Sequence, residues 1–215
     1  MQINIDISSH KIMSMEPVKR ERVLSAAMEE FAKGFKAAST DEIVSKAGIS
    51  KGLLFHYFGT KKGLYQFLCE YALETTVKEF APVLDGKQED MLARIWQIVL
   101  LKRELCSRYP DIFEFLTAVY YQIKEDPGSA FAIRFRQLQS EIYDMFYQEE
   151  DQALLREGLD RVMATNIIRW TLNGLSDQIT GDRKSFQQLN QDFDRYMEET
   201  RQYLDMLRSM LYREH

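Results

Sequence analysis

The sequence predicts an all-α protein, and three observations lead to that prediction. Apolar residues recur with the 3.6-residue period of a helix along most of the 215 residues. Helix breakers are rare, because the chain contains only four prolines and ten glycines. No stretch alternates apolar and polar residues with the period of two that marks a half-buried strand. We therefore expect about nine helices, without an internal repeat.

The N-terminal segment precedes this helical pattern. Residues 1–15 are weakly apolar and show no period, so we expect a flexible arm there. Pro17 suits the first turn of a helix, where its missing amide hydrogen costs nothing. One apolar face follows at helical spacing, formed by Val23, Leu24, Ala27 and Phe31. Gly34 is expected to end this first helix.

Two short helices follow, joined by a turn. Thr40 is placed to cap the first of them, which runs to Ala47. Gly48 lies where the chain must turn sharply, because glycine takes positive φ without steric cost. Ser50 is placed to cap a second helix over residues 51–58. We interpret this pair as a helix-turn-helix whose second helix enters the DNA major groove.

The rest of the chain is predicted to be helical throughout. The expected helices run from Lys61 to Pro82, from about Gln88 to Arg108, from Pro110 to about Asp126, from Ser129 to about Glu149, from Arg161 to Gln178, and from Phe186 to about Tyr212. Cys69 and Cys106 are isolated in helical, partly apolar stretches. We expect both to be buried, reduced thiols.

Charge is distributed unevenly along the chain. The net charge of the whole chain is −5. Residues 1–64 hold 10 Lys and Arg against 7 Asp and Glu, a balance of +3, whereas residues 65–215 hold 18 against 26, a balance of −8. A basic N-terminal part on an acidic remainder is typical of a protein that binds DNA by one end only.

The helix-turn-helix residues identify a family resemblance. The run TDEIVSKAGISKGLLFHYFGTKKGLY, residues 40–65, resembles the DNA-binding signature of the tetracycline-repressor (TetR) family of bacterial regulators. The preceding helix, VLSAAMEEFAKGF, also fits, and the resemblance covers about residues 20–65. It implies a DNA-binding domain over residues 16–62 and an effector-binding and dimerisation domain over residues 63–215. Two residues depart from the usual pattern: Phe55 replaces a more common tyrosine, and Gly63 replaces a helix former.

The resemblance also implies which residues face DNA. This DNA surface comprises Ser50, Lys51, Leu53, Phe55, His56, Tyr57 and Lys61, with Thr40 at the start of the preceding helix. Lysine can reach a guanine edge or a phosphate, and histidine and tyrosine can reach backbone oxygens. Taken alone, Lys51 and Lys61 could equally be ordinary solvated charges, and His56 a structural surface histidine.

Aromatic residues are frequent after residue 90, and the resemblance implies an effector cavity among them. The candidate lining residues are Trp96, Phe113, Thr117, Tyr120, Phe135, Trp170 and Asn173. An apolar or aromatic small molecule would suit such a site. Aromatic residues at helical spacing more often simply fill a core, so plain packing is the alternative for any single residue.

The resemblance further implies a homodimer that binds a palindromic operator and is most simply a repressor. The last two helices are the candidates for the dimer interface, and one stripe of the final helix comprises Phe193, Met197, Leu204 and Leu211. The helix that begins at Lys61 would transmit effector binding to the DNA-binding domain. Two alternatives remain: a transcriptional activator, and a helical small-molecule-binding or protein-interaction module that does not bind DNA.

Other functional classes find little support in the sequence. No Glu-x-x-His pair, phosphate-binding glycine loop or nucleophile elbow is present, so we expect no metal, no cofactor and no enzyme. The N-terminus does not resemble a signal peptide, and no apolar run approaches the ~18 residues of a membrane helix. A cytoplasmic protein is therefore expected.

Overall fold

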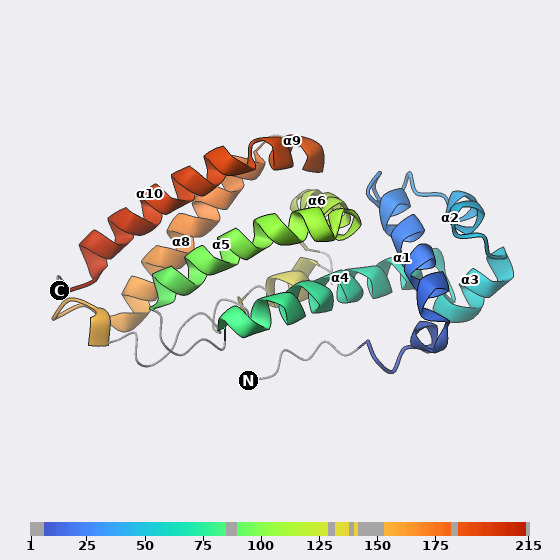
Figure 1. Ribbon diagram of the computed structural model, residues 1–215, viewed down its shortest axis with the longest axis horizontal. Coiled ribbons are helices and arrows are strands. Elements are labelled where there is room, and N and C mark those ends of the chain that lie inside the picture. Colours follow the sequence, from blue (N-terminus) through green and yellow to red (C-terminus); the bar gives the residue numbers. More distant parts are fainter. Residues whose placement is uncertain are drawn as a thin grey trace. The chain divides into compact units, whose positions relative to one another are not determined.

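The computed structural model describes residues 7–84, 90–128, 132–137, 140–141, 153–181 and 185–213. They form a short 3-10 helix, η1 (Lys11–Ser14), and the α-helices α1 (Pro17–Phe31), α2 (Thr40–Ala47), α3 (Lys51–Phe58), α4 (Lys61–Leu84), α5 (Met91–Arg108), α6 (Pro110–Glu125), α8 (Arg161–Thr180), α9 (Phe186–Gln191) and α10 (Phe193–Leu211) (Figure 1). These residues contain no strand, only an isolated antiparallel bridge between Leu155 and Tyr212. The predicted all-α fold is confirmed.

The helix boundaries follow from local capping. The Glu16 carboxylate accepts hydrogen bonds of 2.9 Å from the amides of Val18 and Lys19, and these bonds lower the pKa of Glu16. Helix α1 ends at Phe31, earlier than expected, because the chain turns there before Gly34 adopts a φ of 98°. The helix expected over residues 129–149 is described only at 132–137 and 140–141.

The chain forms two compact units. The N-terminal unit comprises residues 2–79 and 108–133, so that it contains α6 as well as α1–α3 and most of α4. The C-terminal unit comprises residues 80–107 and 134–215. Sequence reasoning assigned all residues after 62 to one domain and did not anticipate that α6 groups with the first helices.

The N-terminal segment differs from the expected flexible arm over residues 7–15. The side chains of Ile7, Ile12 and Met15 are buried, and the amide of Ile7 donates a 3.0 Å hydrogen bond to the buried carboxylate of Glu74. The His10 ring lies against Phe58, at the end of α3, and Phe67 of α4. One 3-10 turn is too short to produce an amphipathic period, which is why the sequence pattern missed this packing.

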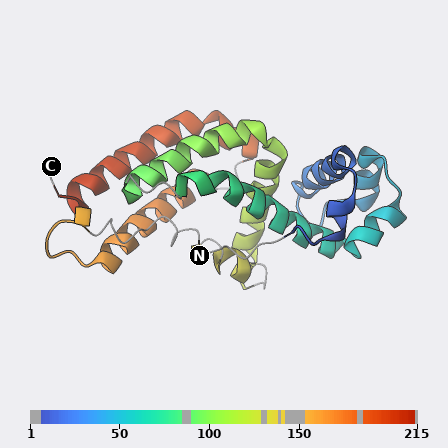
Figure 2. The ribbon, with the colours of Figure 1, turned by 60° about the horizontal axis from the view of Figure 1, so that its bottom comes forward.

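In the C-terminal unit, α8 and α10 pack side by side (Figures 1 and 2). Leu204 is buried within this unit. Each helix also carries an exposed apolar stripe. We call these the outer stripes: Val162, Met163, Ile167 and Trp170 on α8, and Met206 and Met210 on α10. Exposed apolar residues gathered on two adjacent helices are typical of an interaction surface.

Candidate nucleic-acid interface

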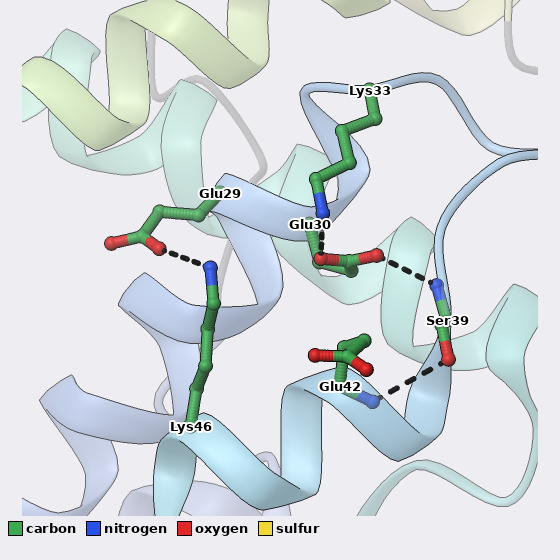
Figure 3. Close-up of polar contacts among 6 residues, drawn as sticks. All are labelled: Glu29, Glu30, Lys33, Ser39, Glu42 and Lys46. Atoms are coloured by element: carbon green, nitrogen blue, oxygen red, sulfur yellow. Dashed lines mark hydrogen bonds and ion pairs between the residues drawn. The ribbon is translucent and has the colours of Figure 1, made fainter.

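A buried carboxylate fixes the loop between α1 and α2 (Figure 3). Glu30, near the end of α1, is only 2% exposed. It accepts a 2.5 Å hydrogen bond from Lys33 Nζ and a 3.1 Å bond from the backbone amide of Ser39. The bond from Lys33 holds the pKa of Glu30 below its usual range, although burial opposes this effect. The carboxylate therefore ties the residue that precedes α2 to the end of α1.

A second contact joins the bodies of the same two helices. Lys46 Nζ of α2 lies 2.9 Å from Glu29 Oε2 of α1. This hydrogen bond raises the pKa of Lys46. Both side chains are 44% exposed, so the pair adds orientation more than stability. Ile43 and Ala47, on the inner face of α2, are fully buried and make the apolar part of this contact.

Helices α2 and α3 are each capped by a serine. The cap of α2 is Ser39, whose Oγ accepts a 3.4 Å hydrogen bond from the amide of Glu42. The prediction that Thr40 caps this helix was therefore wrong by one residue, because Thr40 is already its first helical residue. Gly48 ends α2 with a φ of 64°, as expected. Ser50 caps α3, as expected, and its Oγ accepts a 3.1 Å bond from the amide of Leu53.

Helix α3 has one buried and one accessible face. Leu54 and Phe58 are buried and anchor it to the N-terminal unit. The accessible residues include all those assigned to DNA on this helix: Lys51 and His56 are exposed, and Leu53, Phe55 and Tyr57 are half-buried. The His56 and Tyr57 rings meet edge to face, with centroids 5.3 Å apart. A short helix presented in this way can enter a major groove.

The two lysines expected to contact DNA both have partners within the protein. Lys51 Nζ lies 2.8 Å from Oδ1 and 3.0 Å from Oδ2 of Asp41, on α2. Lys61 Nζ lies 5.0 Å from the centroid of the Phe35 ring and donates a 3.5 Å bond to the carbonyl of Lys36. Sequence reasoning did not anticipate this contact between Asp41 and Lys51.

Gly63 allows α4 to begin where it does. A β-carbon at this position would overlap the carbonyl oxygen of Phe58, the last residue of α3. The amide of Gly63 donates a 2.9 Å bond to Thr60 Oγ1, which caps α4. Glycine is therefore required for the close approach of α3 and α4.

The residues proposed to bind an effector are divided between the two units. Phe113, Thr117 and Tyr120 lie on α6 of the N-terminal unit, where Phe113 is buried and the other two are half-buried. Thr117 Oγ1 donates to the carbonyl of Phe113, and Lys124 Nζ lies 4.7 Å from the centroid of the Tyr120 ring. Of this group, Tyr120 retains the most accessible aromatic surface for a ligand.

The other four candidates belong to the C-terminal unit. Trp96 and Phe135 are half-buried, and the Arg201 guanidinium lies 5.7 Å from the Trp96 ring centroid. Trp170 is 64% exposed, and Asn173 is also exposed. These last two side chains therefore do not line the interior of the unit, and Trp170 belongs to the outer stripe of α8.

Neither cysteine is placed to react. Cys69 and Cys106 are both buried free thiols, as expected, and burial raises the pKa of each. No group of three metal-ligating side chains gathers in the described part of the chain. Among the same residues, no helix has an apolar stretch long enough to cross a membrane.

Comparisons with known proteins agree with this geometry. Residues 23–67 match the family described as bacterial regulatory proteins, tetR family. The chain is 35% identical over 96 residues to the HTH-type transcriptional regulator RutR of Escherichia coli K12, a match that covers 43% of each protein. It is 31% identical over 94 residues to the uncharacterized HTH-type regulator YerO of Bacillus subtilis 168, covering 43% of this chain and 31% of YerO. The chain thus spans less than half the length of either relative.

The likeness in fold extends further than the likeness in sequence. A TetR transcriptional regulator from Chloroflexus aurantiacus J-10-FL superposes with a TM-score of 0.63 at 19% identity, over 92% of this chain and 98% of the other. The C-terminal helices therefore follow the same architecture, although their residues have diverged.

Proposed function

Because residues 23–67 belong to the tetracycline-repressor family of bacterial regulatory proteins, we propose that this chain is a transcriptional regulator that binds double-stranded DNA through α3. The observation that supports this most directly is the form of α3. Its inner face is anchored by Leu54 and Phe58, and its outer face carries Lys51, His56 and Tyr57 within one capped helix of eight residues.

Each residue of this surface has a proposed role. Lys51, at the first position of α3, reaches base edges or the adjacent phosphate, because the N-terminal residues of a recognition helix contact the bases. His56 and Tyr57 donate to phosphate oxygens, and Lys61 binds phosphate at the start of α4. Leu53 and Phe55 supply apolar contact with bases and sugars, while Thr40 and Ser50 face the backbone at the starts of their helices.

We further propose that the protein acts as a homodimer joined through the outer stripes of α8 and α10. Two such helices from each subunit would form a four-helix bundle. A symmetric dimer presents two copies of α3 and would therefore recognise a palindrome whose half-sites lie about 34 Å apart.

The regulatory proposal is that an apolar or aromatic effector releases the protein from DNA. The protein would then act as a transcriptional repressor in the bacterial cytoplasm. Phe113 and Tyr120, both on α6, are the proposed contacts. An effector shifts the protein only if it binds the DNA-incompetent state more tightly than the other state. Since the spacing of the half-sites is fixed, a change of a few ångströms in the distance between the two copies of α3 would prevent both from binding at once.

Selection from a random pool of DNA duplexes tests the central proposal. Wild-type protein should enrich a palindrome, and its affinity should fall steeply with salt because phosphate contacts release counterions. Lys61→Ala should weaken binding to all sequences about equally, whereas Lys51→Ala should also relax base preference. Lys102→Ala, an exposed lysine of α5, is the control. Failure to enrich any duplex would favour a small-molecule-binding module without DNA.

A further inference from the structure

The ion pair between Asp41 and Lys51 joins the two helices of the helix-turn-helix at their N-terminal ends. Both carboxylate oxygens lie within 3.0 Å of Lys51 Nζ. The Lys51 side chain is 50% exposed and that of Asp41 is 72% exposed. The pair is therefore accessible, and an incoming phosphate or base edge could compete for the same ammonium group.

Neither the capping of α2 nor the acidic charge of its first turn depends on Asp41 alone. The cap of α2 is Ser39, and the neighbouring Glu42 supplies an acidic group in the same first helical turn. The other lysine of α2, Lys46, is held by Glu29 of α1. The distinctive contact of Asp41 is with the first residue of the helix that we propose enters the major groove.

We propose that Asp41 is a counter-ion that lowers the affinity of the protein for DNA, because Lys51 must leave it in order to contact DNA. This inference rests on the proposed function. On an unrelated sequence, Lys51 exchanges its contact with Asp41 for a phosphate contact only, and this exchange adds little to the binding free energy. On the operator, Lys51 also gains a base-edge contact, which compensates for the pair that is lost. Because the same pair opens in both complexes, Asp41 lowers both affinities by the same factor, and the base-edge contact alone separates the operator from unrelated DNA.

The size of the effect follows from the exposure of the pair. Separating an exposed ion pair changes an equilibrium constant by about 1.5- to fivefold. If the protein is a dimer, both copies of the pair must open, and the two factors multiply to about two- to 25-fold. Removal of Asp41 should also steepen the salt dependence, since Lys51 then no longer exchanges one anionic partner for another.

The test uses full-length protein and two labelled duplexes of about 30 base pairs: one selected by the wild type, and its scrambled counterpart. Asp41→Asn should bind the scrambled duplex about two- to 25-fold more tightly. It should gain the same factor on the selected duplex, so that the ratio of the two affinities stays unchanged. Glu42→Gln is the matched control, because it removes the same charge from the adjacent exposed position, and it should change both affinities less.

A double-mutant cycle separates this role from simple repulsion of DNA by Asp41. In a Lys51→Met background, Asp41→Asn should have no effect if the carboxylate acts through Lys51. An undiminished effect there, or equal effects of Asp41→Asn and Glu42→Gln, would overturn the inference while leaving the proposed function intact. A wild-type protein that enriches no duplex would instead reject the proposed function and this inference with it.

Discussion

The hydroxyl of Ser25 in α1 donates a hydrogen bond to the carboxylate of Asp111 in the first turn of α6. A second polar contact joins the same region, since the Tyr65 hydroxyl of α4 donates a 2.9 Å bond to Gln122 Oε1 of α6. Helix α6 is thus attached to both α1 and α4 within the N-terminal unit. The sequence pattern did not predict these contacts of α6.

Ser25→Ala should therefore lower the free energy of unfolding by about 0.5–1.5 kcal/mol, the net value of one hydrogen bond. The higher helix propensity of alanine offsets part of this loss. Ser45→Ala, on the exposed face of α2, gives the propensity effect alone and serves as the control. Urea denaturation measures both variants. Equal stabilities would mean that the Ser25–Asp111 bond contributes nothing.

Gly63→Ala should destabilise the protein by about 1–3 kcal/mol, although alanine is the better helix former. The reason is the overlap of the new β-carbon with the carbonyl of Phe58. Gly52→Ala is the matched control in α3, because there the nearest atom is Ser50 Oγ at 4.0 Å, and the substitution should stabilise by up to about 1 kcal/mol. If both variants have a higher melting temperature than the wild type, the backbone around Gly63 can shift enough to accommodate a β-carbon.

His10 should make the packing of residues 7–15 sensitive to acid. Burial of its ring, aided by the charge of Lys11, lowers the pKa of His10 below 6.5. In addition, Nδ1 accepts a bond from the amide of Ile12, which a protonated Nδ1 could not do. The folded state therefore favours neutral His10, so its stabilising contribution is complete above pH 6.5 and is lost as the pH falls through the lowered pKa.

Histidine resonances check this prediction, since the chain has three histidines. The resonance that disappears in His10→Phe should titrate below pH 6.5. The variant should also show a flatter dependence of unfolding free energy on pH as the pH falls below 6.5. A His10 resonance that titrates at 6.5 or above would show that the ring is not held between Phe58 and Phe67.

Trp170→Glu should convert a dimer to monomers without unfolding the subunit. Trp170 is 64% exposed in a single chain, so its replacement leaves the core intact, but a charge buried in an interface costs on the order of several kcal/mol. Gln178→Glu, at an exposed position on the same helix, is the control. Sedimentation and circular dichroism measure the two effects. Leu204→Asp would not separate them, because Leu204 is buried within the subunit.

The parts of this protein that could be predicted from sequence are those with local causes. Gly48 and Ser50 fix a turn and a cap through their own backbone and side chain, and the structure confirms both. Contacts between distant residues have no such signature. Nothing near Trp170 indicates that its side chain faces outward, since a helix that is apolar on two sides gives the same pattern as a buried one. The Asp41–Lys51 pair could not be predicted either, because a contact between two helices leaves no pattern in the sequence of either one.

The grouping of α6 with the first helices limits how such a protein can be recombined with its relatives. A chimera joined near residue 62 would take α1–α3 away from α6, and the hydroxyl of Ser25 and the ring of Phe31 would lose partners that the donor unit supplies. Transplanting DNA recognition into another regulator would therefore require three junctions, one within α4 near Glu79 and two more near residues 108 and 133. The unit that contains α1–α3 is thus discontinuous in the sequence, and its parts would have to be moved together.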